Sequence, residues 1–100
     1  MTKYKHKERG TEIKAMTFDE LVEYGKANGA NIVNGMPWSF KYGDHPITHE
    51  NDECYLIPTP HLHGNYPYSK FTPNDILIVG IIEELTPVPI EDFKNTYELS

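Results

Sequence analysis

A capping box gives this chain its one strong helix signal. The Thr17 hydroxyl can accept a hydrogen bond from the Glu20 amide, while the Glu20 carboxylate reaches back to the Thr17 amide. Met16 and Leu21 fall at the two positions of a hydrophobic staple, and Asn28-Gly29 is a typical helix stop. The sequence therefore predicts one helix from Thr17 to about Asn28.

The remaining apolar segments are short and have the spacing of strands. Thr11–Met16 alternates polar with apolar side chains, which is typical of a half-buried strand. Trp38, Phe40 and Tyr42 alternate in the same way, so we expect them to share one face of a strand. The pattern predicts further strands at residues 32–33, 54–57 and 76–79. The sequence thus predicts an α+β fold: a small, mostly antiparallel sheet of about five strands, one helix in the N-terminal half and a short C-terminal element.

Proline and polar residues indicate where strand pairing stops. Residues 43–52 are polar and contain Pro46, so we expect a loop there. Residues 61–72 are rich in aromatic side chains, with glycine and proline, and are expected to form a second loop. Pro87 and Pro89 are expected to end regular pairing after the most apolar strand.

The chain length fits a single domain. A chain of 100 residues buries about two-thirds of its unfolded surface and folds without disulfides. Residues 1–10 alternate lysine with polar groups and are expected to form a mobile basic arm or an edge strand. Residues 11–100 are then the single α+β domain.

Three features favour a cytoplasmic location. The longest apolar stretch, Ile76–Ile82, is far shorter than the ~20 residues that cross a bilayer. Residues 1–5 contain no apolar run of the kind found in a secretory signal. Cys54 is the only cysteine, which fits a reducing compartment. We therefore expect a cytoplasmic protein that does not associate with membranes.

Charge is unevenly distributed along the chain. Residues 1–14 hold five basic side chains against Glu8 and Glu12, giving +3, and residues 15–100 hold four against thirteen acidic ones, giving −9. The net charge of −6 repels phosphate groups, so nucleic acid is not expected as a partner. A basic partner surface and a simply solvated acidic surface both fit this charge. Self-pairing of an edge strand into a homodimer also stays open.

The histidines are the candidate metal ligands. His61-Leu62-His63 would place two imidazoles on one side of an extended segment. Zinc needs three or four converging ligands, and Pro46 argues against the helix that would align His45 with His49. Polar residues of a surface loop explain the same histidines, so no metal or cofactor is predicted.

The sequence contains no recognisable catalytic motif. To act as a nucleophile, Cys54 would need a neighbouring base. The residues around it instead have the pattern of a strand, in which a lone cysteine is usually a small buried side chain. Phosphate-binding glycine loops, nucleophile elbows and Cys-x-x-Cys pairs are absent from the sequence. We therefore expect a binding protein and not an enzyme.

Aromatic side chains mark the predicted binding surface. Tyr66 and Tyr68, with His61 and His63, lie in the second predicted loop, and Trp38 is expected nearby. Such side chains bury large areas at interfaces and can also stack on bases. A core position is the simpler explanation for Trp38, whereas the two tyrosines are expected to be exposed.

The C-terminal quarter resembles a known group of proteins. Asn74–Gly80, then Glu84, Pro87 and Pro89, and finally Phe93–Glu98, are similar to the ending "GDYIIKGVKGEFYPCKPDIFEKTYE" of short tailed-bacteriophage accessory proteins. Residues 12–18 are similar to the opening strand of that group. Val88 stands where the group has cysteine, and residues 36–71 do not match. The resemblance implies a phage origin and provides no catalytic residues.

Three functions follow from these observations as expectations. The first is a phage accessory protein in the host cytoplasm that binds a host protein without catalysis, and so inhibits a defence or metabolic enzyme. The second is a small-ligand protein that binds or sequesters a nucleotide through the aromatic loop. The third is a metal-dependent enzyme that uses His61 and His63.

Overall fold

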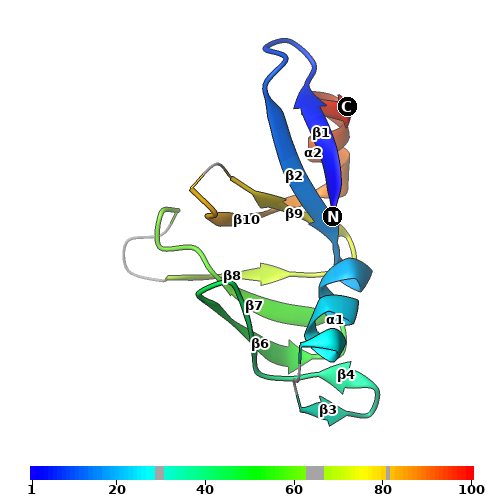
Figure 1. Cartoon of the computed structure of the whole chain (residues 1–100), viewed down its shortest axis with the longest axis vertical. Helices are drawn as coiled ribbons and strands as arrows, with labels where there is room; N and C mark the ends of the chain where they lie inside the picture. Colours follow the sequence, from blue (N-terminus) through cyan, green and yellow to red (C-terminus); the bar gives the residue numbers. More distant parts are fainter. Residues whose placement is uncertain (29–30, 63–66, 81) are drawn as a thin grey trace.

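The computed structural model describes residues 1–28, 31–62, 67–80 and 82–100. Within these residues the chain forms eleven strands and two helices, arranged along an axis of 42 Å with widths of 30 and 22 Å (Figure 1). All strand pairs of the described residues are antiparallel. The predicted α+β class and the antiparallel pairing are thus confirmed, with more strands than the five expected.

A five-stranded sheet forms one end of the molecule. Its strand order is β10-β9-β2-β1-β11. Their bounds are Leu85–Pro89 for β10, Asp75–Val79 for β9, Glu12–Thr17 for β2, Thr2–His6 for β1 and Tyr97–Leu99 for β11. Helix α2, Ile90–Thr96, links β10 to β11 and lies beside this sheet (Figure 1).

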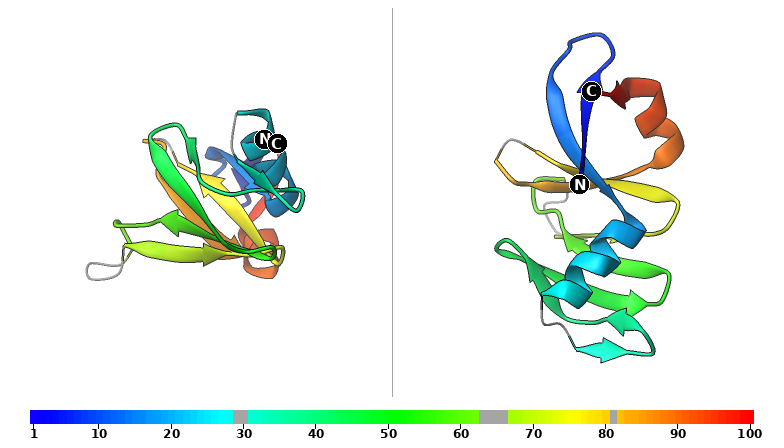
Figure 2. Two further views of the ribbon diagram at one scale, coloured as in Figure 1. Left: turned by 90° about the horizontal axis from the view of Figure 1, so that it is seen from below. Right: turned by 45° about the vertical axis from the view of Figure 1, so that its right-hand side comes forward.

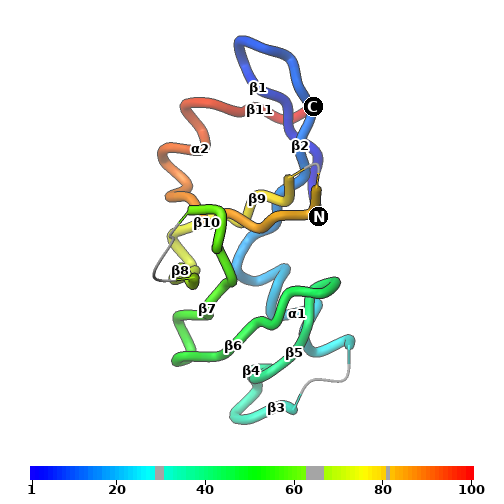
Figure 3. Tube along the Cα trace, turned by 90° about the vertical axis from the view of Figure 1, so that its left-hand side faces the viewer, coloured from blue at the N-terminus to red at the C-terminus, as the bar shows by residue number. Residues whose placement is uncertain are grey.

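A four-stranded sheet and a separate hairpin form the other end. The four-stranded sheet has the order β5-β6-β7-β8. The bounds are Phe40–Tyr42 for β5, His45–Asn51 for β6, Cys54–Pro58 for β7 and Tyr68–Phe71 for β8. The hairpin joins β3, Ile32–Val33, to β4, Met36–Pro37, and lies at the far end from β1 and β2 (Figure 2). β10 lies beside β7 and β8, which brings the two sheets together (Figure 3).

Helix α1, Phe18–Ala27, begins with the predicted capping box. The Glu20 amide donates to the Thr17 hydroxyl at 3.2 Å, and the Thr17 amide donates to the Glu20 carboxylate at 3.1 Å. Met16 and Leu21, the predicted staple, are both buried. The helix ends at Asn28, whose amide donates to the carbonyls of the last turn. The helix prediction is therefore confirmed at both ends.

Two buried clusters hold the fold together. The larger lies where α1 meets the two sheets, and its members are Met16, Phe18, Leu21, Val22, Phe40, Ile47, Tyr55, Ile57, Phe71, Leu77 and Leu85. The smaller consists of Ala15, Ile76 and Phe93, where α2 covers the five-stranded sheet. Tyr4 packs edge-on against Phe93, with ring centroids 4.8 Å apart. The five-stranded sheet therefore contributes to a core on each face.

The expected mobile arm is instead a paired strand. β1 lies between β2 and β11: residues 2–5 pair with β2 and residues 4–6 pair with β11. Tyr4 and His6 point to one face of the sheet, where they contact Phe93 and Tyr97. The alternation of lysine with these two rings is therefore the period-two pattern of a strand.

Three further predictions about loops and strand ends were wrong, of which one is the loop expected at residues 61–72, because β8 occupies residues 68–71. The expected loop at residues 43–52 contains β6, in which Pro46 pairs with Lys41 of β5. Pro87 and Pro89 do not end pairing, because both lie in β10 and pair with β9. β10 is an edge strand, and an edge strand tolerates proline since one of its sides needs no amide donors.

The helices are too short for a membrane span. α1 has ten residues and α2 has seven. Among the described residues there is no helix that is long and apolar enough to cross a bilayer.

Candidate functional site

The predicted binding residues that the structure describes are all exposed. Trp38 is 43% exposed and Tyr68 is 39% exposed, so the core position considered for Trp38 is wrong. His61 lies on the surface and its Nε2 is 3.0 Å from the Thr86 hydroxyl on β10. His63 and Tyr66 lie outside the described residues.

These residues do not form one surface. Tyr68 pairs with Pro58 at one end of β7, whereas Trp38 stacks on His49 beside Tyr55 near the other end. The expectation that Trp38 joins the aromatic loop is therefore wrong. Trp38 also does not share a strand with Phe40, because β5 begins at Phe40.

Trp38 belongs instead to an apolar surface on the β3–β4 hairpin. Its amide donates to the Asn31 carbonyl at 2.9 Å, which extends the hairpin by one pair. Ile32 is 48% exposed and Val33 is 38% exposed on the facing strand. We call Ile32, Val33 and Trp38 the hairpin surface. Asn34-Gly35 forms the turn, with φ of 51° and 80°, as a type I′ hairpin requires.

The Trp38 ring is held in place from beneath. It stacks on the His49 ring with centroids 4.8 Å apart and an interplanar angle of 11°. The His49 side chain is 7% exposed, and its Nε2 donates to the Asp52 carboxylate at 2.9 Å. Because His49 is fixed from both sides, Trp38 presents its outer face to water with little freedom to reorient.

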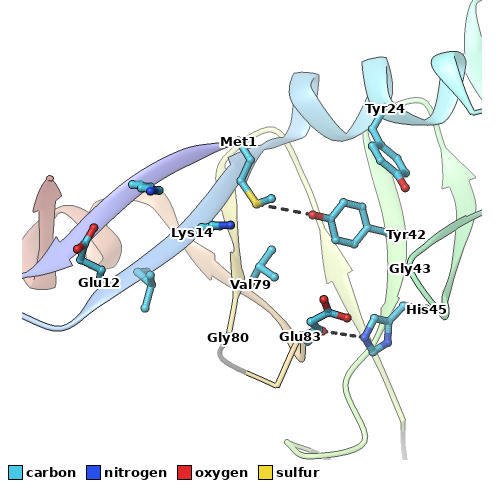
Figure 4. Close-up of a pocket in the computed structure, with 12 residues that line it drawn as sticks. Met1, Glu12, Lys14, Tyr24, Tyr42, Gly43, His45, Val79, Gly80 and Glu83 are labelled. Carbon is cyan, nitrogen blue, oxygen red and sulfur yellow. Dashed lines mark hydrogen bonds between the residues drawn. The ribbon is translucent and has the colours of Figure 1, made fainter.

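A cleft of about 660 Å³ opens between the two sheets (Figure 4). β1, β2 and β9 form one wall, and α1, β5 and the start of β6 form the other. Its volume lies within the range of about 300–1,000 Å³ that small-molecule sites occupy. A smaller hollow of about 470 Å³ lies beside α2, and Ile76 and Phe93 of the smaller cluster line it together with Tyr4, Ile90 and Tyr97.

Two tyrosines line one wall of the cleft. The rings of Tyr24 and Tyr42 are 4.8 Å apart at 57°, and the Tyr42 hydroxyl donates to the Met1 sulfur at 3.6 Å. Burial raises the pKa of Tyr42, and the neighbouring Tyr24 and Glu83 raise it further. The hydroxyl therefore stays protonated and acts as a donor in this wall.

The floor of the cleft is fixed by a histidine. His45 Nε2 donates to the Glu83 carbonyl at 2.8 Å, which ties the β9–β10 turn to β6 (Figure 4). Since a carbonyl only accepts, the Nε2 atom carries the proton. Lys3 and Lys14 line the opposite wall. Sequence patterns did not indicate that these residues share a cleft: His45 was considered only as a metal ligand, and the alternation of Lys3 with Tyr4 shows only that Lys3 lies on the opposite face of a strand from Tyr4.

The histidines and carboxylates of the described chain do not converge on a metal site. In residues 1–28, 31–62, 67–80 and 82–100, no group of three His, Cys, Asp or Glu side chains lies close enough to share an ion. His61 bonds to Thr86, and its expected companion His63 falls outside these ranges.

Cys54 is a buried thiol of low reactivity. It is 5% exposed on β7, and burial, with a smaller contribution from Glu50, raises its pKa to about 11 from an ordinary 9.0. With a pKa of about 11 in place of 9.0, the thiolate fraction of Cys54 at pH 8 is about a hundredfold lower than that of a free thiol.

We expect Cys54 to react slowly with iodoacetamide in the folded protein. At pH 8 the rate should fall at least tenfold below the rate in concentrated urea, because the folded chain both shields the sulfur and disfavours its charged form. Mass spectrometry of the alkylated protein over time measures both rates. Equal rates in buffer and in urea would show that the thiol is not buried.

Comparison of the chain with protein-family models, with curated proteins and with solved structures gave no match.

Proposed function

We propose that the chain is a phage accessory protein that acts without catalysis by binding a host protein in the host cytoplasm. Inhibition of a host defence or metabolic enzyme is the expected consequence. The observation that carries the proposal is the hairpin surface, where three large apolar side chains are exposed within seven residues, positions 32 to 38. The similarity of residues 74–98 to phage proteins supports the assignment of origin.

The hairpin surface has the chemistry of an interface anchor. Tryptophan is enriched among the residues that dominate binding energy, and Trp38 is already ordered by its stack on His49. A side chain that is ordered before binding loses less entropy on association. Val33 and Trp38 lie on one face of the hairpin and Ile32 on the other, where its cross-strand neighbour Pro37 is buried, so a partner that covers β3 contacts exposed side chains of both faces.

Strand β3 projects from the rest of the fold, whereas β4 packs on α1 through the buried Pro37. β3 and β4 pair only with each other among the described strands, and they lie at the end of the molecule remote from β1 and β11 (Figure 1). An apolar projection of this kind fits a groove on a partner protein. The net charge of −6 favours a partner whose groove is rimmed by basic groups.

The proposal is tested with the immobilised protein and a lysate of a bacterial host. Wild type should retain a host protein in a stoichiometric amount, and purified partner should bind Trp38→Ala at least about thirtyfold more weakly, the effect of an anchor worth roughly 2 kcal/mol. Ile32→Ser provides a second variant that leaves the Trp38–His49 stack in place.

Leu99→Ala is the matched control for these variants. Leu99 is a large apolar residue that is 67% exposed, and it lies on β11 at the other end of the molecule. It should bind the partner like wild type. Failure to retain any partner, or equal retention by all four proteins, would refute binding through the hairpin surface.

A further inference from the structure

The cleft between the two sheets carries a pair of lysines that the fold leaves without acidic partners. Lys3 on β1 and Lys14 on β2 are directly opposite in the register, so their side chains leave the sheet on the same face. Like charges in this arrangement repel. Within the described part of the chain neither lysine forms an ion pair.

The neighbouring cross-strand pair differs in the signs of its charges. Lys5 lies opposite Glu12 in the register, so this next pair on the same face combines opposite charges, although no ion pair joins the two side chains within the described residues. The Glu12 carboxylate in turn accepts a hydrogen bond from the Ser100 hydroxyl at 3.1 Å. Lys3 and Lys14 thus face each other as a like-charged pair, and Glu12, two residues from Lys14 on the same face, is an acidic group of the same cleft.

Two opposed ammonium groups form a site for one compact anion. Directly opposite residues have Cβ atoms about 5 Å apart, so two flexible lysine side chains can reach the same phosphate group. The Lys14 amine points into the cleft, and Val79 lies between it and the Glu83 carboxylate in Figure 4. An anion held by the lysines would then contact the apolar Val79 before it approached Glu83.

The tyrosine wall offers a surface for a flat ring. Tyr24 and Tyr42 are partly buried against the larger cluster, and both also line the cleft. Stacking of a base on an aromatic side chain contributes about 1–3 kcal/mol of binding free energy per base. A ligand that spans from the lysines to this wall would need an anionic group at one end and a planar group at the other.

We propose that the cleft binds a small phosphorylated molecule that carries a flat ring, of the nucleoside monophosphate class. Lys3 and Lys14 hold the phosphate, and Tyr24 and Tyr42 lie against the ring. His45 keeps the floor in place through its hydrogen bond to the Glu83 carbonyl. This site is separate from the hairpin surface, so it does not depend on binding of a protein partner.

Calorimetric titration at low salt with AMP, GMP, CMP and UMP tests the proposal. At least one of these should bind the wild-type protein, and its affinity should exceed that of the matching nucleoside and of inorganic phosphate by at least tenfold. The double variant Lys3→Gln/Lys14→Gln should lose at least tenfold in affinity. Higher salt should also weaken binding, because the lysines act through charge.

Three control variants, Lys5→Gln, Tyr42→Phe and Trp38→Ala, and one further test variant, Tyr42→Leu, separate the site from general effects. Lys5→Gln removes one positive charge from the same face and should change the affinity less than threefold. Tyr42→Phe keeps the ring and should retain binding, whereas Tyr42→Leu should weaken it at least fivefold. Trp38→Ala should bind the nucleotide like wild type. Circular dichroism verifies that each variant is folded.

The proposal is overturned by any of three results. These are no binding of all four nucleotides at millimolar concentration, equal affinity of wild type and the double lysine variant, and inorganic phosphate binding as tightly as the nucleotides. The last result would indicate a plain anion site without a role for the tyrosine wall.

Discussion

Phe71→Ala should lower the free energy of unfolding by about 3–5 kcal/mol, the loss typical of a truncated core phenylalanine. Phe71 ends β8 and is fully buried in the larger cluster. Its ring lies 5.7 Å from that of Phe18, so the substitution leaves a cavity where α1 packs on the four-stranded sheet. Urea denaturation followed by far-ultraviolet circular dichroism measures the change.

Tyr68→Ala is the matched control because it changes an aromatic residue on the same strand. Tyr68 is 39% exposed, and surface substitutions usually stay within about 0.5 kcal/mol. The two variants should therefore differ clearly in how much they lower the free energy of unfolding. Equal losses for Phe71→Ala and Tyr68→Ala would mean that Tyr68 belongs to the core and not to the surface.

Gly25→Ala should destabilise the protein, although alanine is the better helix former. In an exposed helix the substitution would stabilise by about 1 kcal/mol. Here an added Cβ would lie 2.8 Å from Phe40 Cε1 and 2.8 Å from Pro37 Cγ, and both neighbours are buried. Overpacking of this kind costs typically 1–3 kcal/mol, so the net effect should be a loss of up to about 2 kcal/mol.

The control for Gly25 is the next residue of the helix. Lys26 is exposed, and its contact with Glu23 at 3.4 Å is a surface ion pair of little weight. Lys26→Ala should leave the urea midpoint nearly unchanged. A Gly25→Ala protein more stable than wild type would contradict the close packing of α1 on β4 and β5.

The elements predicted correctly are those specified by neighbouring residues. The Thr17–Glu20 capping box lies within four positions, and the strand-like alternation of residues 11–16 lies within six. These signals are local because their hydrogen bonds and dihedral angles involve only adjacent residues. The antiparallel α+β class followed from the same kind of evidence, since short strand-like segments outnumbered the single helix.

The missed strand β6 depended on information from outside its own residues. Pro46 suggested a loop, yet residues 45–47 pair only with β5, while Thr48 and the residues after it pair with β7. A strand can carry proline where one of its sides has no neighbour, because no amide is required on that side. Only the sheet order reveals this, and the sequence alone does not contain it.

The cleft was missed for a related reason. Lys3 and Lys14 are eleven positions apart, and their alignment depends on the register of β1 against β2. Tyr24 and Tyr42 come from a helix and a strand that meet only after folding. The loop around Tyr66 and Tyr68 stood out in the sequence because its aromatic residues are near neighbours in the chain, whereas the residues of the cleft are not.

The most direct test of binding through the hairpin uses the only tryptophan of the chain. Protein labelled with 5-fluorotryptophan gives one fluorine resonance, from Trp38, and its position and width report the surroundings of that ring. Addition of the purified host partner should shift or broaden this resonance in proportion to the complex formed. A complex that forms while the resonance stays unchanged would show that the partner binds elsewhere on the protein.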